Sequence, residues 1–147
     1  EDHAVRAIVT LARFVAWLGL TAVGVVHAVW AAGSSWPAKN HKELSQLTVG
    51  SQAQPTAAAT AVVAATAITG GAVAAGALGE GRPVVTARRL AGGLLIARAA
   101  LGGDAALSVL GLPKAGKRFI ELDNRYYRPL CAVLGFAVLV GARRPKN

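Results

Sequence analysis

The chain of 147 residues is short of the charged side chains that usually cover a soluble protein. Charged residues make up 16% of it, whereas about a quarter is usual in soluble domains. Acidic residues are scarcer still: seven stand against 16 Lys and Arg, which gives a formal net charge of +9. The mean hydropathy is +0.46, and the apolar residues gather in long blocks separated by charges. A bilayer sorts a sequence in this way, so we expect an integral membrane protein.

The sequence also lacks most of the residues that bind metals or form disulfides. Cys131 is the single cysteine, which excludes an intrachain disulfide. Of the three histidines only His27 lies in an apolar block, so we expect no metal or haem ligation and no cofactor. Methionine is absent, so we expect that Glu1 is not the translation start, and that residues precede it or the start was trimmed.

Motifs of familiar catalytic sites are missing from the sequence as well. It contains no glycine-rich phosphate loop at a strand–helix junction, no nucleophile elbow and no paired carboxylates. We therefore assign no catalytic residue, and an enzyme is the less favoured class. Most Lys and Arg flank apolar blocks, which favours contact with anionic lipid headgroups over nucleic-acid binding.

Four apolar blocks predict four transmembrane helices, at about residues 7–32, 56–78, 84–112 and 125–142. At a rise of ~1.5 Å per residue the first is roughly 39 Å long, and the last is about 27 Å long when it starts at Arg125. Arg13 lies near the start of the first block and is expected to reach the headgroups. The predicted fold is an all-α membrane protein, a four-transmembrane-helix bundle in one domain over residues 1–147.

Small residues recur at four-residue spacing in the second block and form a glycine pair in the third. Such spacing lets two helix backbones approach closely. We therefore assign helix packing to Gly70, Gly71, Ala75, Gly102 and Gly103.

Three polar residues, His27, Arg98 and Asp104, lie inside apolar blocks. A charge near the middle of a bilayer costs at least ~2.5–3.5 kcal/mol, so it usually faces the protein interior and has a partner. We expect Arg98 to meet a residue on another helix or a ligand, and His27 to share its depth with Asp104. Two interpretations stay open: a buried polar cluster that fixes helix register, or a proton relay or ligand site. The candidate cluster, including residues from the same predicted face, is His27, Trp30, Arg98, Asp104, Asp123, Tyr126 and Tyr127.

The orientation in the membrane is only weakly encoded. In the predicted topology eight basic residues lie on the side of the N-terminus and seven on the other, so the positive-inside rule decides little. The pairs Arg88–Arg89 and Arg143–Arg144 directly abut helices. They favour cytoplasmic N- and C-termini.

Three segments carry a recognisable combination of motifs. His27–Gly33 has the form His-x-x-Trp-x-x-Gly, Tyr127–Cys131 reads Tyr-x-Pro-Leu-Cys, and Arg98–Gly103 lies between them. Together they resemble the DUF3995 family of small bacterial membrane proteins, except that Ser34-Ser35 stand where a second glycine is usual. The resemblance implies four helices and a bacterial inner membrane and supplies no activity. The Ala-, Gly-, Val- and Arg-rich composition is typical of a high-GC actinobacterium.

Three functional hypotheses remain. The first is an accessory or structural subunit that packs against a larger membrane protein or a second copy of itself, in contact with lipids. The second is a membrane site for a lipid, quinone or small solute, centred on His27, Arg98 and Asp104. The third is a membrane enzyme, which would need an acid–base pair such as His27 with Asp104 within hydrogen-bond reach.

Overall fold

The computed structural model describes residues 1–50 and 54–143, and within these ranges the regular structure is entirely helical. The long helices are α1 (Asp2–Ala31), α3 (Ala57–Ala75), α4 (Arg82–Leu101) and α7 (Arg128–Gly141). The short ones are α2 (His41–Thr48), α5 (Gly103–Val109) and α6 (Lys117–Leu122). A π-helical turn, η1 (Asp123–Tyr127), joins α6 to α7, and the residues at both joints keep right-handed helical dihedrals.

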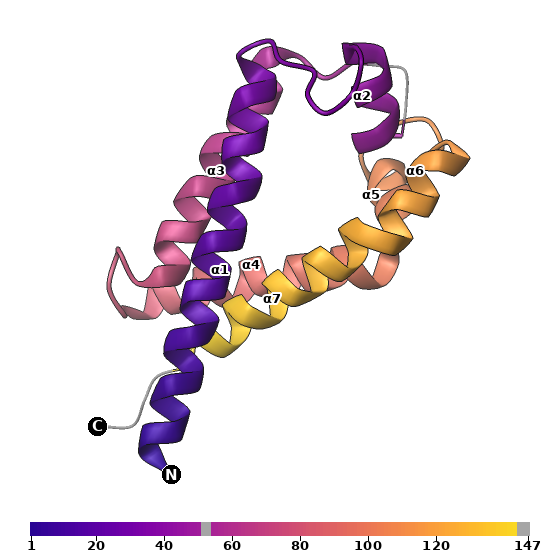
Figure 1. Ribbon diagram of the computed structural model, residues 1–147. Coiled ribbons are helices and arrows are strands. Elements are labelled where there is room, and N and C mark those ends of the chain that lie inside the picture. The colour runs from indigo at the N-terminus through magenta and orange to yellow at the C-terminus, as the bar shows by residue number, and fades with distance from the viewer. Residues whose placement is uncertain (51–53, 144–147) are drawn as a thin grey trace.

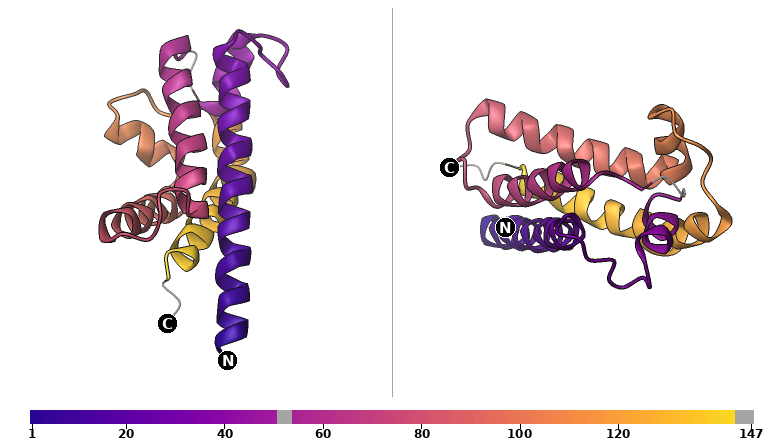
Figure 2. Two further views of the ribbon diagram at one scale, coloured as in Figure 1. Left: turned by 90° about the vertical axis from the view of Figure 1, so that its left-hand side faces the viewer. Right: turned by 90° about the horizontal axis from the view of Figure 1, so that it is seen from above.

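The long helices form two hairpins rather than one parallel bundle. Figure 1 shows α1 and α3 side by side in one arm, and α4 and α7 side by side in a second arm set at an angle to the first. The arms meet where α3 turns into α4, and there α7 also packs on α1. Seen from above in Figure 2, the second arm extends away from the end-on axes of α1 and α3.

Glycines allow the two helices of each hairpin to approach closely. In the first arm, a Cβ on Gly24 of α1 would lie 2.9 Å from the carbonyl oxygen of Ala64. In the second, a Cβ on Gly135 of α7 would lie 3.0 Å from the carbonyl oxygen of Gly92. Nearly all real Cβ contacts are longer than these two distances, so both contacts depend on the missing side chain.

The small residues assigned to packing divide between different surroundings. Gly71 lies against α1, where an added Cβ would be 3.2 Å from the carbonyl oxygen of Trp17, whereas Gly70 has nothing within 4 Å and Ala75 is exposed. Gly103 lies against the Phe119 ring. The assignment therefore distinguished poorly between neighbouring positions, because periodicity alone does not say which face meets a partner.

Within the part of the chain that the structure describes, two or three helices could span a membrane by length and composition. α1 and α3 are long and apolar enough to cross a membrane, and α4 with α5 would add a third span if the pair, bent by 111°, is counted as one. A bundle of four transmembrane helices is not confirmed. α7 by itself is about 21 Å long, short of the ~30 Å hydrocarbon core.

Helix boundaries depart from the expected ones where polar residues continue a helix or glycine ends one. The predicted third helix, 84–112, is wrong as a single element, because it breaks at Gly102, whose φ of +83° favours glycine. The helical structure of the last segment begins at Lys117 instead of 125, and α1 begins at Asp2 instead of 7. Apolar patterning marks the part of a helix that suits lipid and does not mark where its polar continuation stops.

Adjacent glycines on α3 provide a test of the first arm. Gly71→Leu should lower the stability of the isolated chain by about 1–3 kcal/mol, because the contact with α1 has no room for the side chain. Gly70→Leu should be neutral or stabilising, because its position is open and leucine favours helix over glycine. Unfolding in detergent–SDS mixtures measures both variants, and equal losses would contradict this packing.

Candidate functional site

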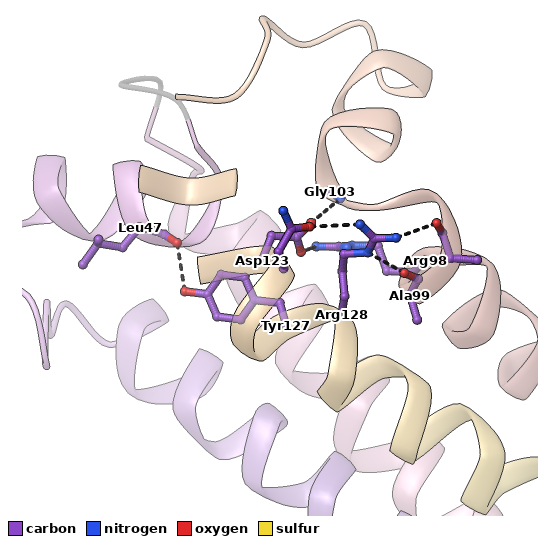
Figure 3. A network of polar contacts seen from close by, with 9 residues as sticks. Leu47, Arg98, Ala99, Gly103, Asp123, Tyr127 and Arg128 are labelled. Carbon is purple, nitrogen blue, oxygen red and sulfur yellow. Dashed lines mark hydrogen bonds and ion pairs between the residues drawn. The ribbon is translucent and has the colours of Figure 1, made fainter. Parts of the chain in front are cut away.

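The centre of the candidate site is the break between α4 and α5. Gly102 has φ +83° and ψ 168°, so the chain leaves α4 there and starts α5 at Gly103. A break of this kind frees carbonyl groups at the end of one helix and N–H groups at the start of the next. Side chains from η1 and the start of α7 bind these groups (Figure 3).

Asp123, the first residue of η1, binds both a helix start and a cation. Its side chain is 5% exposed. Oδ2 accepts a hydrogen bond from the backbone N–H of Gly103 at 2.6 Å, and Oδ1 accepts one from Nη2 of Arg98 at 2.6 Å. The carboxylate therefore complements the positive end of α5 and neutralises the charge of Arg98.

Arg128 binds the opposite end of the break. Its Nε donates to the carbonyl oxygen of Ala99 at 2.6 Å, and its Nη2 donates to that of Ala100 at 2.7 Å. Nη1 donates to Oδ1 of Asn124 at 2.9 Å. A guanidinium at the C-terminal end of α4 is electrostatically favourable, because the free carbonyls there carry partial negative charge.

The π turn extends this network to α2. Tyr127 donates from its hydroxyl to the carbonyl oxygen of Leu47 at 2.9 Å, and its ring packs on Phe119 with centroids 6.0 Å apart. A π turn inserts one extra residue into a helix and is often found at functional sites. Here it brings Asp123 and Tyr127 into contact with two different parts of the chain. We refer to Arg98, Gly103, Asp123, Tyr127 and Arg128 as the junction network.

One donor of the junction network is unused. Nη1 of Arg98 is buried and has no hydrogen-bond partner among the described residues. The Arg98 side chain as a whole is 27% exposed. An unpaired buried donor is uncommon in folded proteins, so this nitrogen is the open position of the network.

The structure brings together only part of the predicted cluster. Arg98 meets Asp123, and Tyr127 shares the same turn. His27 instead has its Nδ1 2.7 Å from the carbonyl oxygen of Val23 in its own helix, and its ring meets Trp30 edge to face.

The remaining predicted residues also have local partners. Trp30 donates to the carbonyl oxygen of Trp36 at 2.6 Å. Asp104 is exposed and accepts the N–H of Ala115 at 3.0 Å, and exposed Tyr126 lies under the Arg125 guanidinium. None of these contacts involves Arg98.

A second set of charges joins the two arms where they meet. The Arg88 side chain on α4 is 1% exposed, and it donates to the carbonyl oxygens of Val73 and Gly79 at 2.7 and 2.9 Å. Its Nη1 also pairs with Oε2 of Glu80 at 2.8 Å, while Oε1 of Glu80 pairs with Nη1 of Arg13 at 2.8 Å. We call Arg13, Glu80 and Arg88 the arginine–glutamate clamp.

The clamp also reaches the end of α7, because Nε of Arg13 donates to the carbonyl oxygen of Gly141 at 2.9 Å. The sequence did not predict this clamp: Arg13 was expected to reach the headgroups, and Arg88 was used only as a sign of orientation. One signal was available: Glu80 is one of only seven acidic residues and lies in a glycine turn directly before the arginine-rich start of α4.

Two opposing effects act on Glu80, which lies in the turn between α3 and α4. Partial burial raises the pKa of its carboxyl group, and hydrogen bonds and attraction from Arg88 and Arg13 lower it. The lowering prevails, so the pKa of Glu80 lies below its ordinary value of 4.5.

A separate cavity of about 240 Å³ lies between the end of α1, α2 and the start of α3. Trp30 is the one member of the predicted cluster that lines it, beside polar residues that include His41, Ser45, Thr48 and Thr60. Within the described ranges, no group of three or more His, Cys, Asp or Glu residues is placed to hold a metal ion.

Comparison with known protein families finds a match that covers most of the chain. The family model described as "Protein of unknown function (DUF3995)" matches residues 20–138. The chain belongs to the DUF3995 family. No curated protein and no solved structure matches it. The part matched by DUF3995 contains the entire junction network and, of the clamp, Glu80 and Arg88, but it excludes Arg13.

Two aspartates of this DUF3995 protein provide a test of the junction network. Asp123→Asn should cost roughly 3 kcal/mol of stability, because it leaves the guanidinium of Arg98 without its counter-charge. Asp104→Asn should stay within about 0.5 kcal/mol, because that side chain is exposed and asparagine keeps the accepting oxygen. Unfolding in detergent–SDS mixtures compares them, and a loss for Asp123→Asn no larger than the control's would refute the network.

Acid should weaken the clamp. The pKa of Glu80 is lower in the folded chain than its ordinary 4.5. The stability that the ionised Glu80 carboxylate contributes is therefore complete above pH 4.5. It is lost as the pH falls from 4.5 through the folded-state pKa. The melting temperature of the wild type should therefore exceed that of Glu80→Gln at neutral pH, and the gap should close in acid. A gap that stays constant down to pH ~3 would speak against this linkage.

Proposed function

We propose that this DUF3995 protein is a non-catalytic integral membrane protein of the bacterial inner membrane. It acts as an accessory or structural subunit that packs against a larger membrane protein or a second copy of itself. The observation that carries the proposal is the exposure of its apolar helices. In each of α1 and α3, only 17% of an apolar 18-residue stretch is buried inside the molecule. Their remaining surface is open to lipid and to other helices.

The outer face of α4 is the part of this surface best suited to another helix. Leu90, Gly93, Leu94, Ala97 and Leu101 follow the spacing of one helical stripe and all are exposed. Gly93 has nothing within 4 Å, and Ala97 follows it at four-residue spacing. Small residues at this spacing let a neighbouring helix approach closely in a membrane, with the leucines packing on either side.

The polar residues support a structural role because they bind the protein's own helix ends. Asp123 and Arg128 satisfy the break between α4 and α5, and Arg88 satisfies carbonyls near the end of α3. Groups held in this way stabilise one conformation. The alternative, a solute or proton site centred on His27, Arg98 and Asp104, has less support because these three residues have separate partners.

In the proposed topology α1 and α3 cross the membrane, and the second arm enters it as two further tilted segments, α4–α5 and α6–α7. The start of α1 and the end of α7 lie towards the same end of the molecule (Figure 1). Arg82, Arg89 and Arg143 lie on α4 and just after α7 at that end. Their charge supports a cytoplasmic location for both termini.

Particle mass tests the proposal. Extracted from its native membrane in lipid nanodiscs, the chain should appear with a second copy or a stoichiometric partner, at a protein mass above its own 14.9 kDa. Gly93→Trp should abolish that assembly by blocking the close approach at α4. Gly70→Trp, at an equally open position on α3, is the matched control. A wild-type particle containing one chain and lipid alone would refute the subunit role.

A further inference from the structure

An apolar groove runs between α1 and α7 on the outside of the molecule, where the two arms meet. Its volume is about 420 Å³. Ile8 and Leu11 line it on α1, and Val133, Phe136 and Val140 line it on α7, with Arg143 as its charged member. Phe136 is 67% exposed and Leu11 is 62% exposed, so large apolar side chains border an open surface.

The dimensions of the groove suit a hydrocarbon chain better than a helix. From Val133 to Arg143 the groove follows the chain for about 15 Å, half of the ~30 Å hydrocarbon core and so the depth of one leaflet. A helix of the same length and ~10 Å diameter would occupy roughly 1,200 Å³. The groove has about a third of that volume, which admits a single extended chain.

The charge around the groove selects the headgroup of such a lipid. The side chain of Arg143 makes no hydrogen bond or ion pair with another described residue, and the side chains of Arg82 and Arg89, which border a separate hollow on α4, are equally unpaired there. Glu80, the acid of this region, already holds Arg13 and Arg88. The net charge where α4 begins and α7 ends is therefore +4, from five arginines and one glutamate: Arg13, Arg82, Arg88, Arg89, Arg143 and Glu80.

We propose that the groove binds one acyl chain of an anionic phospholipid, whose phosphate pairs with Arg143. The apolar walls on α1 and α7 take the chain. Arg82 and Arg89 strengthen the positive potential that attracts the headgroup. The site does not depend on the subunit role proposed above, because the groove lies between α1 and α7 and the partner face lies on α4.

Lipid retention measured by native mass spectrometry tests the site. The full chain, delipidated in mild detergent, is mixed with phosphatidylglycerol and phosphatidylcholine that carry identical acyl chains. The wild type should retain phosphatidylglycerol preferentially. Arg143→Gln should lower that retention about fivefold, the usual contribution of one basic residue near an anionic lipid. Val140→Trp should fill the groove and reduce retention of both lipids.

Arg118→Gln is the matched control, because Arg118 is exposed on α6, distant along the second arm, and lies 3.6 Å from Glu43. It should retain phosphatidylglycerol as the wild type does. Equal retention of the two lipids, or an Arg118→Gln loss equal to that of Arg143→Gln, would overturn the proposal. Displacement of phosphatidylglycerol by glycerol phosphate at equal concentration would also overturn it, because an acyl chain would then contribute nothing. None of these results bears on the particle mass, so a failure of the lipid proposal can be told apart from a failure of the subunit proposal.

Discussion

Carbonyl oxygens in the last turn of a helix lack some of the donors that the helix itself provides, and at the ends of α3 and α4 other side chains of this chain bind them. Both ends are satisfied by an arginine from a later helix. Arg88 binds the carbonyls of Val73 and Gly79, and Arg128 binds those of Ala99 and Ala100. A guanidinium suits this task because its several N–H groups donate in fixed directions and its charge complements the negative end of a helix. The positions of the later helices are thus tied to the ends of the earlier ones.

Acidic residues determine where these arginines can lie buried. Glu80 balances Arg88 and Arg13 in the clamp, and Asp123 balances Arg98 in the junction network. Within each arm, by contrast, contact depends on the absence of side chains, as at Gly24 and Gly135. The molecule therefore combines close apolar packing along its hairpins with charge pairing at the ends of their helices.

The sequence predicted the parts of this architecture that local patterning encodes. The all-helical class, the positions of α1 and α3 to within about five residues, and membership of DUF3995 could all be read from apolar blocks and motifs. The expectation that Arg98 would meet another helix or a ligand was confirmed in its first form, by Asp123. Asp104, the other aspartate of the predicted cluster, accepts the N–H of Ala115 instead.

The rest depended on geometry that spacing does not contain. The glycine pair Gly102-Gly103 is compatible with a close helix contact and with a break, and only the dihedral angles of Gly102 distinguish them. The contact of Arg13 with Gly141 joins residues 128 apart in the chain. No local pattern anticipates such a pairing, and it helps to set the angle between the arms.

Tyr127 helps to fix the angle between the two arms from the side opposite their junction. Its hydrogen bond to Leu47 ties α2 to the far part of the second arm, and Gly116 donates to the carbonyl of Gly50 beside it. The chain thus forms a triangle, with the two arms as sides and the segment around α2 as the third (Figure 1). Opening the angle between the arms would pull on this segment and strain its hydrogen bonds with Tyr127 and Gly116. The short, polar segment around α2 therefore limits how far the two apolar arms can move apart.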